Sequence, residues 1–257
     1  MQLEVLVADP GSRQGIRSLA GMLQETEYVI RAYAGDLNEA MQLLLHRHFD
    51  ILICINRSPS FFAAKMLRLI GQSAVQIPTV VISLSEDPQR MRECFLLGAI
   101  DFLSEPLEPD ELMHALGRAA ELIHARLIDT EYNTAMEQAL AALPRTEQNA
   151  PIIEKLRAFL ETVRGQTATV ELAADYFGFN RDYFGRYFKS RFGMTFGEFY
   201  KGFQIGYAKL LLETGQFKVL EVSRQLGFSS QDYFTRVFKR RTGVIPSLYK
   251  KKADRSA

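Results

Sequence analysis

The chain has 257 residues, 47% hydrophobic and 24% charged, a composition typical of globular proteins and a length sufficient for two domains. No apolar run approaches the roughly 18 residues that a membrane-spanning helix needs, and the N-terminus lacks the basic-then-apolar pattern of a signal peptide. Two cysteines are too few for a disulfide framework. We therefore expect a cytoplasmic protein with no membrane partner.

The net charge of +1 conceals two halves of opposite sign. Residues 1–150 carry 12 Lys and Arg against 20 Asp and Glu, a balance of −8. Residues 151–257 carry 19 against 10, a balance of +9. This asymmetry predicts an acidic half joined to a half that binds polyanions, provided that the basic residues gather on one face.

The acidic half alternates short apolar runs with helical stretches. The runs are residues 5–8, 28–33, 51–55, 79–83 and 100–103. Their alternation with helices predicts an α/β domain built on a doubly wound, five-stranded parallel sheet. Ligands of such sheets bind outside the carboxyl ends of the strands, which here are marked by Asp9, Ile55, Ser83 and Glu105.

Residues 1–125 resemble the receiver domain of two-component response regulators. Residues 98–107 match the last strand of that family, and residues 55–59 follow the third strand in the expected place. The resemblance implies an acidic cluster for Mg²⁺ after the first strand and a phosphoacceptor Asp after the third. It also implies a Ser or Thr after the fourth strand and a Lys after the fifth.

Two of these four positions depart from the family pattern. Asp9 and Ser83 fit, but Ile55 occupies the phosphoacceptor position and Glu105 replaces the Lys. A shift of one residue brings Asn56 to the phosphoacceptor position, and an amide cannot accept phosphate either. Glu105 would also repel a phosphoryl group. We therefore expect a degenerate receiver that uses neither aspartyl phosphate nor a cofactor, with a phosphorelay-controlled regulator as the alternative.

A structural or dimerising role is our first interpretation of this domain, and a site for another ligand is the second. The family often pairs receivers through the region that corresponds to residues 87–125. A near-heptad apolar stripe begins in this region and continues toward the second half, which predicts a short coiled coil or the buried face of a helix. The stripe comprises Leu112, Leu116, Ala119, Ile123 and Leu127. Residues 126–150 are expected to be a linker that begins as a helix and ends in a Pro-containing polar run.

The basic half contains one pattern twice. Its Gly-Phe dipeptide occurs at Gly178 and again at Gly227, and the run Tyr-Phe-x-Arg-x-Phe-Lys begins at Tyr183 and again at Tyr233. Each copy predicts a short helix, a glycine turn and a second helix, with Phe184 and its counterparts as core. Two helices joined in this way form a helix-turn-helix, whose second helix enters the DNA major groove.

Residues 151–253 resemble the AraC/XylS-type DNA-binding domain throughout. The resemblance rests on the spacing of the two copies, on the connecting helix that contains residues 203–212 and on the closing run from Gly243 to Tyr249. It implies that the connecting helix holds both recognition helices against one side of double-stranded DNA. They would enter successive major-groove segments about 34 Å apart. The implied function is sequence-specific transcription regulation, with RNA polymerase as a further possible partner.

The polar faces of the two second helices are the candidate DNA-binding site. By position in the family, base contacts fall to Arg181, Asp182 and Arg186 in the first copy and to Gln231, Asp232, Thr235 and Arg236 in the second. Phosphate contacts fall to Lys189, Lys239 and Arg240. Gly185 provides no side chain at a position that should reach the groove, so the first copy is expected to read fewer bases than the second.

Other kinds of site have no support in the sequence. The four histidines are not joined by cysteines or carboxylates at metal-ligand spacing, and there is no glycine-rich phosphate loop and no nucleophile–base motif. We therefore expect no enzymatic activity. An adaptor protein, whose acidic domain binds a partner protein and whose helical half contributes only surface, is the remaining alternative.

Overall fold

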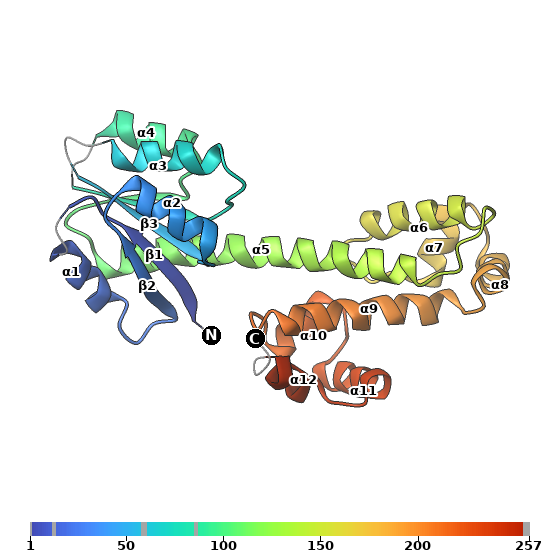
Figure 1. Ribbon diagram of the computed structural model, residues 1–257. Coiled ribbons are helices and arrows are strands. Elements are labelled where there is room, and N and C mark those ends of the chain that lie inside the picture. The colour runs from blue at the N-terminus through green and yellow to red at the C-terminus, as the bar shows by residue number, and fades with distance from the viewer. Residues whose placement is uncertain (1, 12–13, 58–60, 85–86, 254–257) are drawn as a thin grey trace. The chain divides into compact units, whose positions relative to one another are not determined.

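The computed structural model describes residues 2–11, 14–57, 61–84 and 87–253 (Figure 1). The chain divides into two compact units, Met1–Ala125 and Arg126–Ala257. None of the helices in the described part of the chain is both long enough and apolar enough to cross a membrane.

The first unit is a doubly wound α/β domain. Its five strands are all parallel, in the order β2-β1-β3-β4-β5, which confirms the predicted sheet. The elements are β1 (Leu3–Ala8), α1 (Gln14–Met22), β2 (Tyr28–Ala34), α2 (Leu37–His46), β3 (Ile51–Asn56), α3 (Phe62–Gly71), β4 (Thr79–Ser83), α4 (Pro88–Leu96), β5 (Asp101–Ser104) and the start of α5 (Pro109–Ala141).

Both faces of this sheet are covered, because β3 and β4 are buried at every position. Alternate residues of β3 enter two separate cores. Ile53 and Ile55 belong to the core that contains Leu112 of α5, whereas Cys54 belongs to the core that contains Met66 of α3. Figure 1 shows α3 and α4 on one side of the sheet, and α1 on the other. The carboxyl ends of the strands are therefore left to form the site.

The second unit is helical. Its elements are the last part of α5, then α6 (Ala150–Thr162), α7 (Val170–Phe177), α8 (Arg181–Phe192), α9 (Phe196–Glu213), α10 (Val219–Gln225), α11 (Gln231–Thr242) and α12 (Pro246–Ala253). The long helix α9 lies between the pair α7–α8 and the pair α10–α11 (Figure 1). One core rich in aromatic side chains joins all of these helices.

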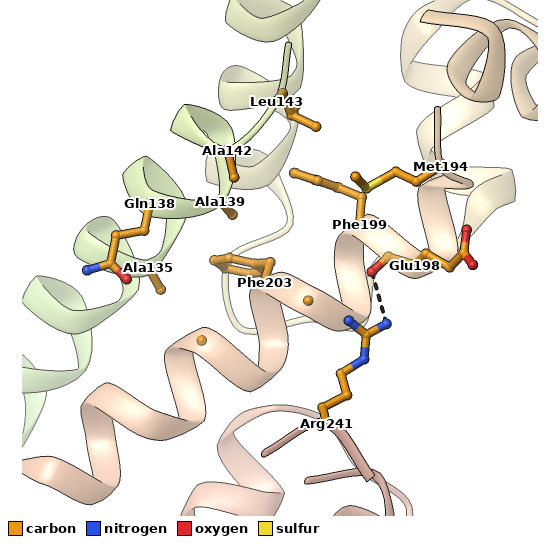
Figure 2. Close-up of a pocket in the computed structure, with 12 residues that line it drawn as sticks. Ala135, Gln138, Ala139, Ala142, Leu143, Met194, Glu198, Phe199, Phe203 and Arg241 are labelled. Carbon is orange, nitrogen blue, oxygen red and sulfur yellow. Dashed lines mark hydrogen bonds between the residues drawn. The ribbon is translucent and has the colours of Figure 1, made fainter. Parts of the chain in front are cut away.

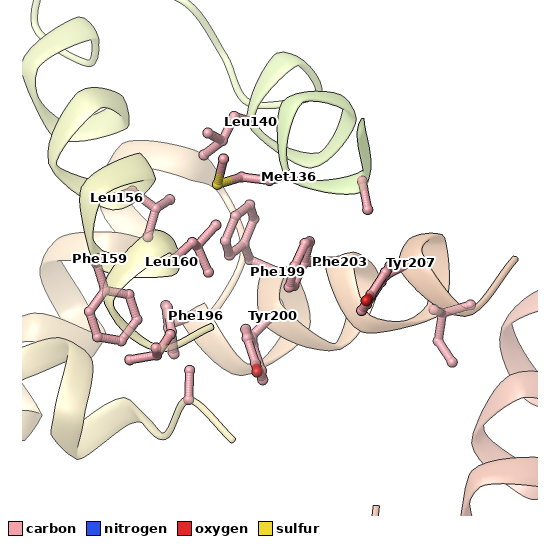
Figure 3. Close-up of a cluster of buried hydrophobic side chains, with 14 of the residues drawn as sticks. Met136, Leu140, Leu156, Phe159, Leu160, Phe196, Phe199, Tyr200, Phe203 and Tyr207 are labelled. Carbon is pink, nitrogen blue, oxygen red and sulfur yellow. The ribbon is translucent and has the colours of Figure 1, made fainter. Parts of the chain in front are cut away.

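Residues 126–141 were expected to begin a linker, but they form part of the core of the second unit. Tyr132 is buried and its Oη donates a hydrogen bond to the carbonyl oxygen of Leu160 (2.6 Å). Met136 and Leu140 pack beside Leu156, Leu160 and Phe199 (Figure 3). The apolar stripe of α5 is therefore the buried face of a helix, with Leu112, Leu116 and Ala119 buried in the first unit.

Candidate DNA-binding interface and receiver site

The two repeated segments fold into the same helix-turn-helix. Gly178, with φ of 76°, ends α7, and Gly227, with φ of 71°, follows α10. A residue with a Cβ atom is strained at these left-handed positions, which explains the choice of glycine. The second helix of each copy is capped by a polar side chain: Asn180 accepts a hydrogen bond from the backbone N–H of Tyr183 (2.8 Å), and Ser230 accepts one from that of Tyr233 (3.2 Å).

The recognition helices α8 and α11 have the same pattern of burial, residue by residue, over their first ten positions. Phe184 and Phe188 are fully buried in α8, as are Phe234 and Phe238 in α11. The candidate DNA-binding residues lie on the opposite face of each helix. Arg181, Asp182, Arg186, Lys189, Gln231, Asp232, Arg236, Lys239 and Arg240 are exposed, and Thr235 is half-buried.

We call Arg181, Asp182, Gly185, Arg186 and Lys189 the α8 stripe. The α11 stripe consists of the matching residues Gln231, Asp232, Thr235, Arg236 and Lys239. The members of each stripe are separated by one, three or four positions, which places them on one face of a helix. The structure therefore gathers nine of the ten candidate residues on two similar surfaces, with Arg240 beside the second.

Hydrogen bonds hold the two copies in a fixed relationship within the second unit. The side chain of Gln204, buried in α9, donates to the carbonyl oxygen of Leu226 (2.8 Å). Tyr200, one turn earlier in α9, donates to the carbonyl oxygen of Gln166 (3.2 Å). The helix α9 thus anchors the loop before the first copy and the turn of the second. Neither residue belongs to the candidate site predicted from the sequence, although a glutamine within an apolar helical run is a signal for such a buried contact.

The turn of the second copy has a further anchor on α9. The Nζ of Lys201 lies 4.6 Å from the centre of the Phe228 ring, within the range of a cation–π contact. Partial burial, and secondarily the nearby charge of Arg241, lower the pKa of Lys201 from its usual value. A lysine whose ammonium group packs on a ring is less available for DNA, so we leave Lys201 out of the candidate interface.

Two cavities adjoin the helix-turn-helix copies. One is a hollow of about 700 Å³ beside Gly185, lined by Val170, Arg181, Asp182, Gly185, Arg186, Lys189, Thr195, Phe196 and Gly197. The other, of about 330 Å³, has an apolar wall that contains Ala139, Phe199 and Phe203 (Figure 2). At its edge Arg241, in the last turn of α11, donates to the backbone carbonyl oxygen of Glu198 in α9 (3.3 Å), which fixes the end of the recognition helix to α9.

In the first unit, the four predicted receiver positions meet at the carboxyl edge of the sheet. Ile55 pairs with Ile82 in the strand register, one step before the pair of Asn56 and Ser83. Asp9, Ile55 and Ser83 are buried, whereas Glu105 is exposed. Residues 58 and 59 of the motif that follows β3 lie outside the described residues.

The carboxylate of Asp9 is bound by an arginine. The Nε of Arg57 lies 2.8 Å from one carboxylate oxygen and its Nη2 lies 2.9 Å from the other. The backbone N–H of Gly11 donates a third hydrogen bond to Asp9 (2.9 Å). The hydrogen bond with Asp9, together with the charges of Asp9 and Glu105, outweighs burial and raises the pKa of Arg57.

Glycine at position 11 makes this arginine pair possible. A Cβ atom built on Gly11 would lie 2.3 Å from the Cδ and the Nε of Arg57, which is closer than real Cβ contacts. Arg57 is not among the residues predicted from the sequence, because its partner lies 48 positions away in the chain. Its place just after β3, at the ligand-binding edge of the sheet, was the available signal.

The position of the phosphoacceptor has an apolar environment. Ile55 lines a cavity of about 340 Å³ with Leu19, Met22, Ile82 and Leu107, and among the described residues of this lining Glu105 is the one that carries a charge. Within the described ranges, no three His, Cys, Asp or Glu side chains are placed to hold a metal ion.

Comparisons with known proteins identify both domains. A model of the response regulator receiver domain family matches residues 5–117, and a model of a helix-turn-helix domain family matches residues 173–252. The chain therefore combines a receiver domain with an AraC-type helix-turn-helix domain. These assignments agree with the sheet of the first unit and the two helix-turn-helix copies of the second.

Two similar curated proteins match short stretches of the chain. The TCP pilus virulence regulatory protein of Vibrio cholerae is 40% identical over 57 residues, which are 22% of this chain and 21% of that protein. The HTH-type transcriptional activator RhaR of Salmonella typhi is 35% identical over 69 residues, 27% of this chain and 24% of that protein. The chain thus spans less than a quarter of the length of either relative.

Two similar solved structures each cover part of the chain. The receiver domain of an HD domain-containing protein from Pseudomonas fluorescens is 25% identical, covers 49% of this chain and 99% of its own, and has a TM-score of 0.44. The C-terminal domain of the two-component response regulator yesN from Fusobacterium nucleatum is 26% identical, covers 38% of this chain and 94% of its own, and has a TM-score of 0.36.

Proposed function

We propose that this protein is a transcription regulator, acting in the cytoplasm, which binds double-stranded DNA sequence-specifically through both helix-turn-helix copies. The observation that carries the proposal is the pair of matched stripes on α8 and α11, both exposed and both built from side chains that hydrogen-bond to bases or phosphates. The similar curated proteins are named as regulators of transcription or virulence, which agrees with the proposal.

The charges of the second half support a DNA partner. Residues 151–257 have a balance of +9, and each stripe contains an arginine and a lysine one turn apart. Guanidinium groups bind guanine through two hydrogen bonds, and ammonium groups bind phosphates as point charges. We assign base recognition chiefly to Arg236 and Thr235, and phosphate binding to Lys239 and Arg240.

Salt dependence tests this function directly. Selection from a random DNA pool would supply a preferred duplex, and its affinity would then be measured from low to moderate salt. Neutralisation of about six to eight phosphates predicts a log–log slope near −5 to −7. An affinity that barely changes with salt, or a protein that selects no sequence, would contradict the proposal. An adaptor would instead co-purify with a partner protein in stoichiometric amounts and would not retard DNA.

We further propose that the receiver domain works without aspartyl phosphate. Three observations support this: Ile55 replaces the phosphoacceptor, Arg57 covers both oxygens of Asp9, and Glu105 carries a negative charge where the family has a Lys. A cation already bound to Asp9 competes with Mg²⁺, which needs carboxylate oxygens.

Acetyl phosphate with Mg²⁺ tests phosphorylation of the intact protein. We expect no gain of a phosphoryl mass and no change in DNA affinity. A covalently labelled protein with altered DNA affinity would instead favour the phosphorelay alternative.

We infer that two copies pair through the first unit, in the region of residues 87–125. Phe95 and Leu96, at the end of α4, are 44% and 78% exposed, which is unusual for large apolar side chains outside a contact surface. Sedimentation of the full chain would show the pairing, and Leu96→Glu should shift it toward monomer. RNA polymerase is the further partner that a transcription regulator of this kind requires.

A further inference from the structure

The α8 and α11 stripes differ at two of their five matched positions. Gly185 in α8 matches Thr235 in α11, and Arg181 matches Gln231. The remaining three positions hold Asp, Arg and Lys in both copies. Because the two helices share one burial pattern, the difference between the copies lies in their chemistry and not in which face they expose.

The first difference removes the side chain at the centre of the α8 stripe. A Cβ atom built on Gly185 would meet no heavy atom within 4 Å, so the space beside it is open. This space is the hollow of about 700 Å³ described above. Base recognition requires a donor or acceptor that projects into the groove. At this position Thr235 offers a hydroxyl group in the second copy, whereas the first copy offers a concave surface.

The second difference concerns the charge at the edge of the hollow. Arg181, Arg186 and Lys189 line it, and Asp182 is the one acidic residue that the described part of the chain contributes to this lining. Arg181 is held there by Glu171 of α7, whose carboxylate lies 2.9 Å from its Nε. The position that matches Glu171 in the second copy is Leu220, which cannot form such a pair.

The pairing of Arg181 favours a role other than base recognition. A hydrogen bond from its own backbone N–H, and then one from Thr169, lower the pKa of Glu171, so this carboxylate is ionised and able to hold Arg181. A guanidinium held at its Nε still has donors on both Nη atoms. Three cations around a concave surface suit a group with several acceptor oxygens and a negative charge, and in DNA that group is a backbone phosphate.

We propose that the hollow beside Gly185 binds a phosphate of the DNA backbone, so that α8 contributes mainly affinity and α11 contributes most of the base recognition. This inference rests on the proposed DNA-binding function. It also changes the expected role of Arg186 from base contact to phosphate contact. The operator should then carry sequence information chiefly in the segment that α11 enters.

The experiment first locates the DNA segment that α8 contacts. A DNA-cleaving reagent attached to the full-length Ser190→Cys variant would mark it, since Ser190 is exposed on α8 outside the stripe. The native Cys54 and Cys94 are 0% and 2% exposed and should not react with the reagent. Affinities are then measured for duplexes that carry either one base-pair substitution or one neutral methylphosphonate in place of a phosphate.

We expect one methylphosphonate in the α8 segment to weaken binding of the wild-type protein about tenfold, because it removes one hydrogen-bonded charge contact. Base-pair substitutions in that segment should change the affinity less than about threefold. Substitutions in the α11 segment should change it at least about fivefold.

Two variants at one position link this effect to the hollow. Gly185→Leu places an apolar side chain in the hollow, and should weaken binding to all sequences about tenfold and abolish the sensitivity to the methylphosphonate. Gly185→Ala adds only a methyl group and should retain the sensitivity, so it is the matched control. Circular dichroism of both variants would show whether α8 still folds.

The possible failures are distinguishable. A protein that binds no DNA would overturn the proposed function together with this inference. A protein that binds DNA, but reads bases equally in both segments or ignores every methylphosphonate in the α8 segment, would overturn this inference alone. If the Gly185→Leu variant remained sensitive to the methylphosphonate, this inference alone would again be overturned, because the phosphate would then lie outside the hollow.

Discussion

Arg57 covers the buried carboxylate of Asp9, with its Nε and Nη2 at 2.8 and 2.9 Å from the two carboxylate oxygens. The side chain of Asp9 is 1% exposed and that of Arg57 is 25% exposed. The pair joins the loop after β1 to the loop after β3, at the edge where a receiver domain holds its metal ion. In the phosphate-independent receiver that we propose, the Arg57 guanidinium takes the place of the metal ion.

Removal of the Arg57 side chain should destabilise the first unit. Arg57→Ala leaves a buried carboxylate without its charged partner, which costs about 1–3 kcal/mol when the lost partner is itself partly exposed to solvent. Urea unfolding followed in the first unit would measure the loss. Arg31→Ala is the matched control, since Arg31 forms an exposed pair with Glu4 at 3.0 Å and should cost less than about 1 kcal/mol. Equal losses in the two variants would show that the Asp9 pair is an ordinary surface contact.

Gly11→Ala should break the same pair from the other side. The added methyl group would lie 2.3 Å from the Cδ of Arg57, so the arginine must leave its place on Asp9. We expect a loss of stability similar to that of Arg57→Ala, and little additional loss when the two changes are combined. The control is Gly21→Ala in α1, where a Cβ meets nothing within 4 Å and where the change should stabilise by about 0.5–1 kcal/mol. Additive losses in the double variant would argue against a shared cause.

The end of α5 should be as important to the second unit as its own helices. Leu140 is 0% exposed within that core, and Leu140→Ala should destabilise the second unit by about 2–5 kcal/mol. Leu96→Ala removes a side chain that is 78% exposed and should leave the second unit unchanged. Unfolding followed by aromatic absorbance would report mainly the second unit, where most rings lie. A Leu140→Ala protein with an unchanged unfolding midpoint would show that residues 126–141 are dispensable for this core.

Arg236 and Lys239 should differ in how they affect DNA binding. Arg236→Ala should remove about 1–3 kcal/mol of discrimination at one base pair, whereas Lys239→Ala should weaken all sequences alike and reduce the salt slope by about 1. The affinities of both variants are measured on the same panel of duplexes, each with one base-pair substitution. If both variants lose affinity uniformly across the panel, Arg236 contacts a phosphate and not a base.

The sequence alone determined the features that depend on residues close together in the chain. The alternation of apolar runs predicted the five-stranded parallel sheet, and the two glycine turns with their polar caps predicted both helix-turn-helix copies. In the structure Asn180 and Ser230 cap the second helices of the two copies. Helical periodicity also placed both stripes on exposed faces, because side chains three and four positions apart share one side of a helix.

Only the tertiary structure decided which distant residues meet. Asp9 and Arg57 become partners because β1 and β3 are neighbours in the sheet, and no local pattern encodes that order. By its sequence alone, a helix over residues 126–141 is compatible with a linker as well as with a helix of the core. Its burial against α6 and α9 follows from packing that involves residues up to 79 positions away, as in the hydrogen bond from Tyr207 to the carbonyl oxygen of Ile128. Periodicity shows that a face is apolar, and the fold determines what covers that face.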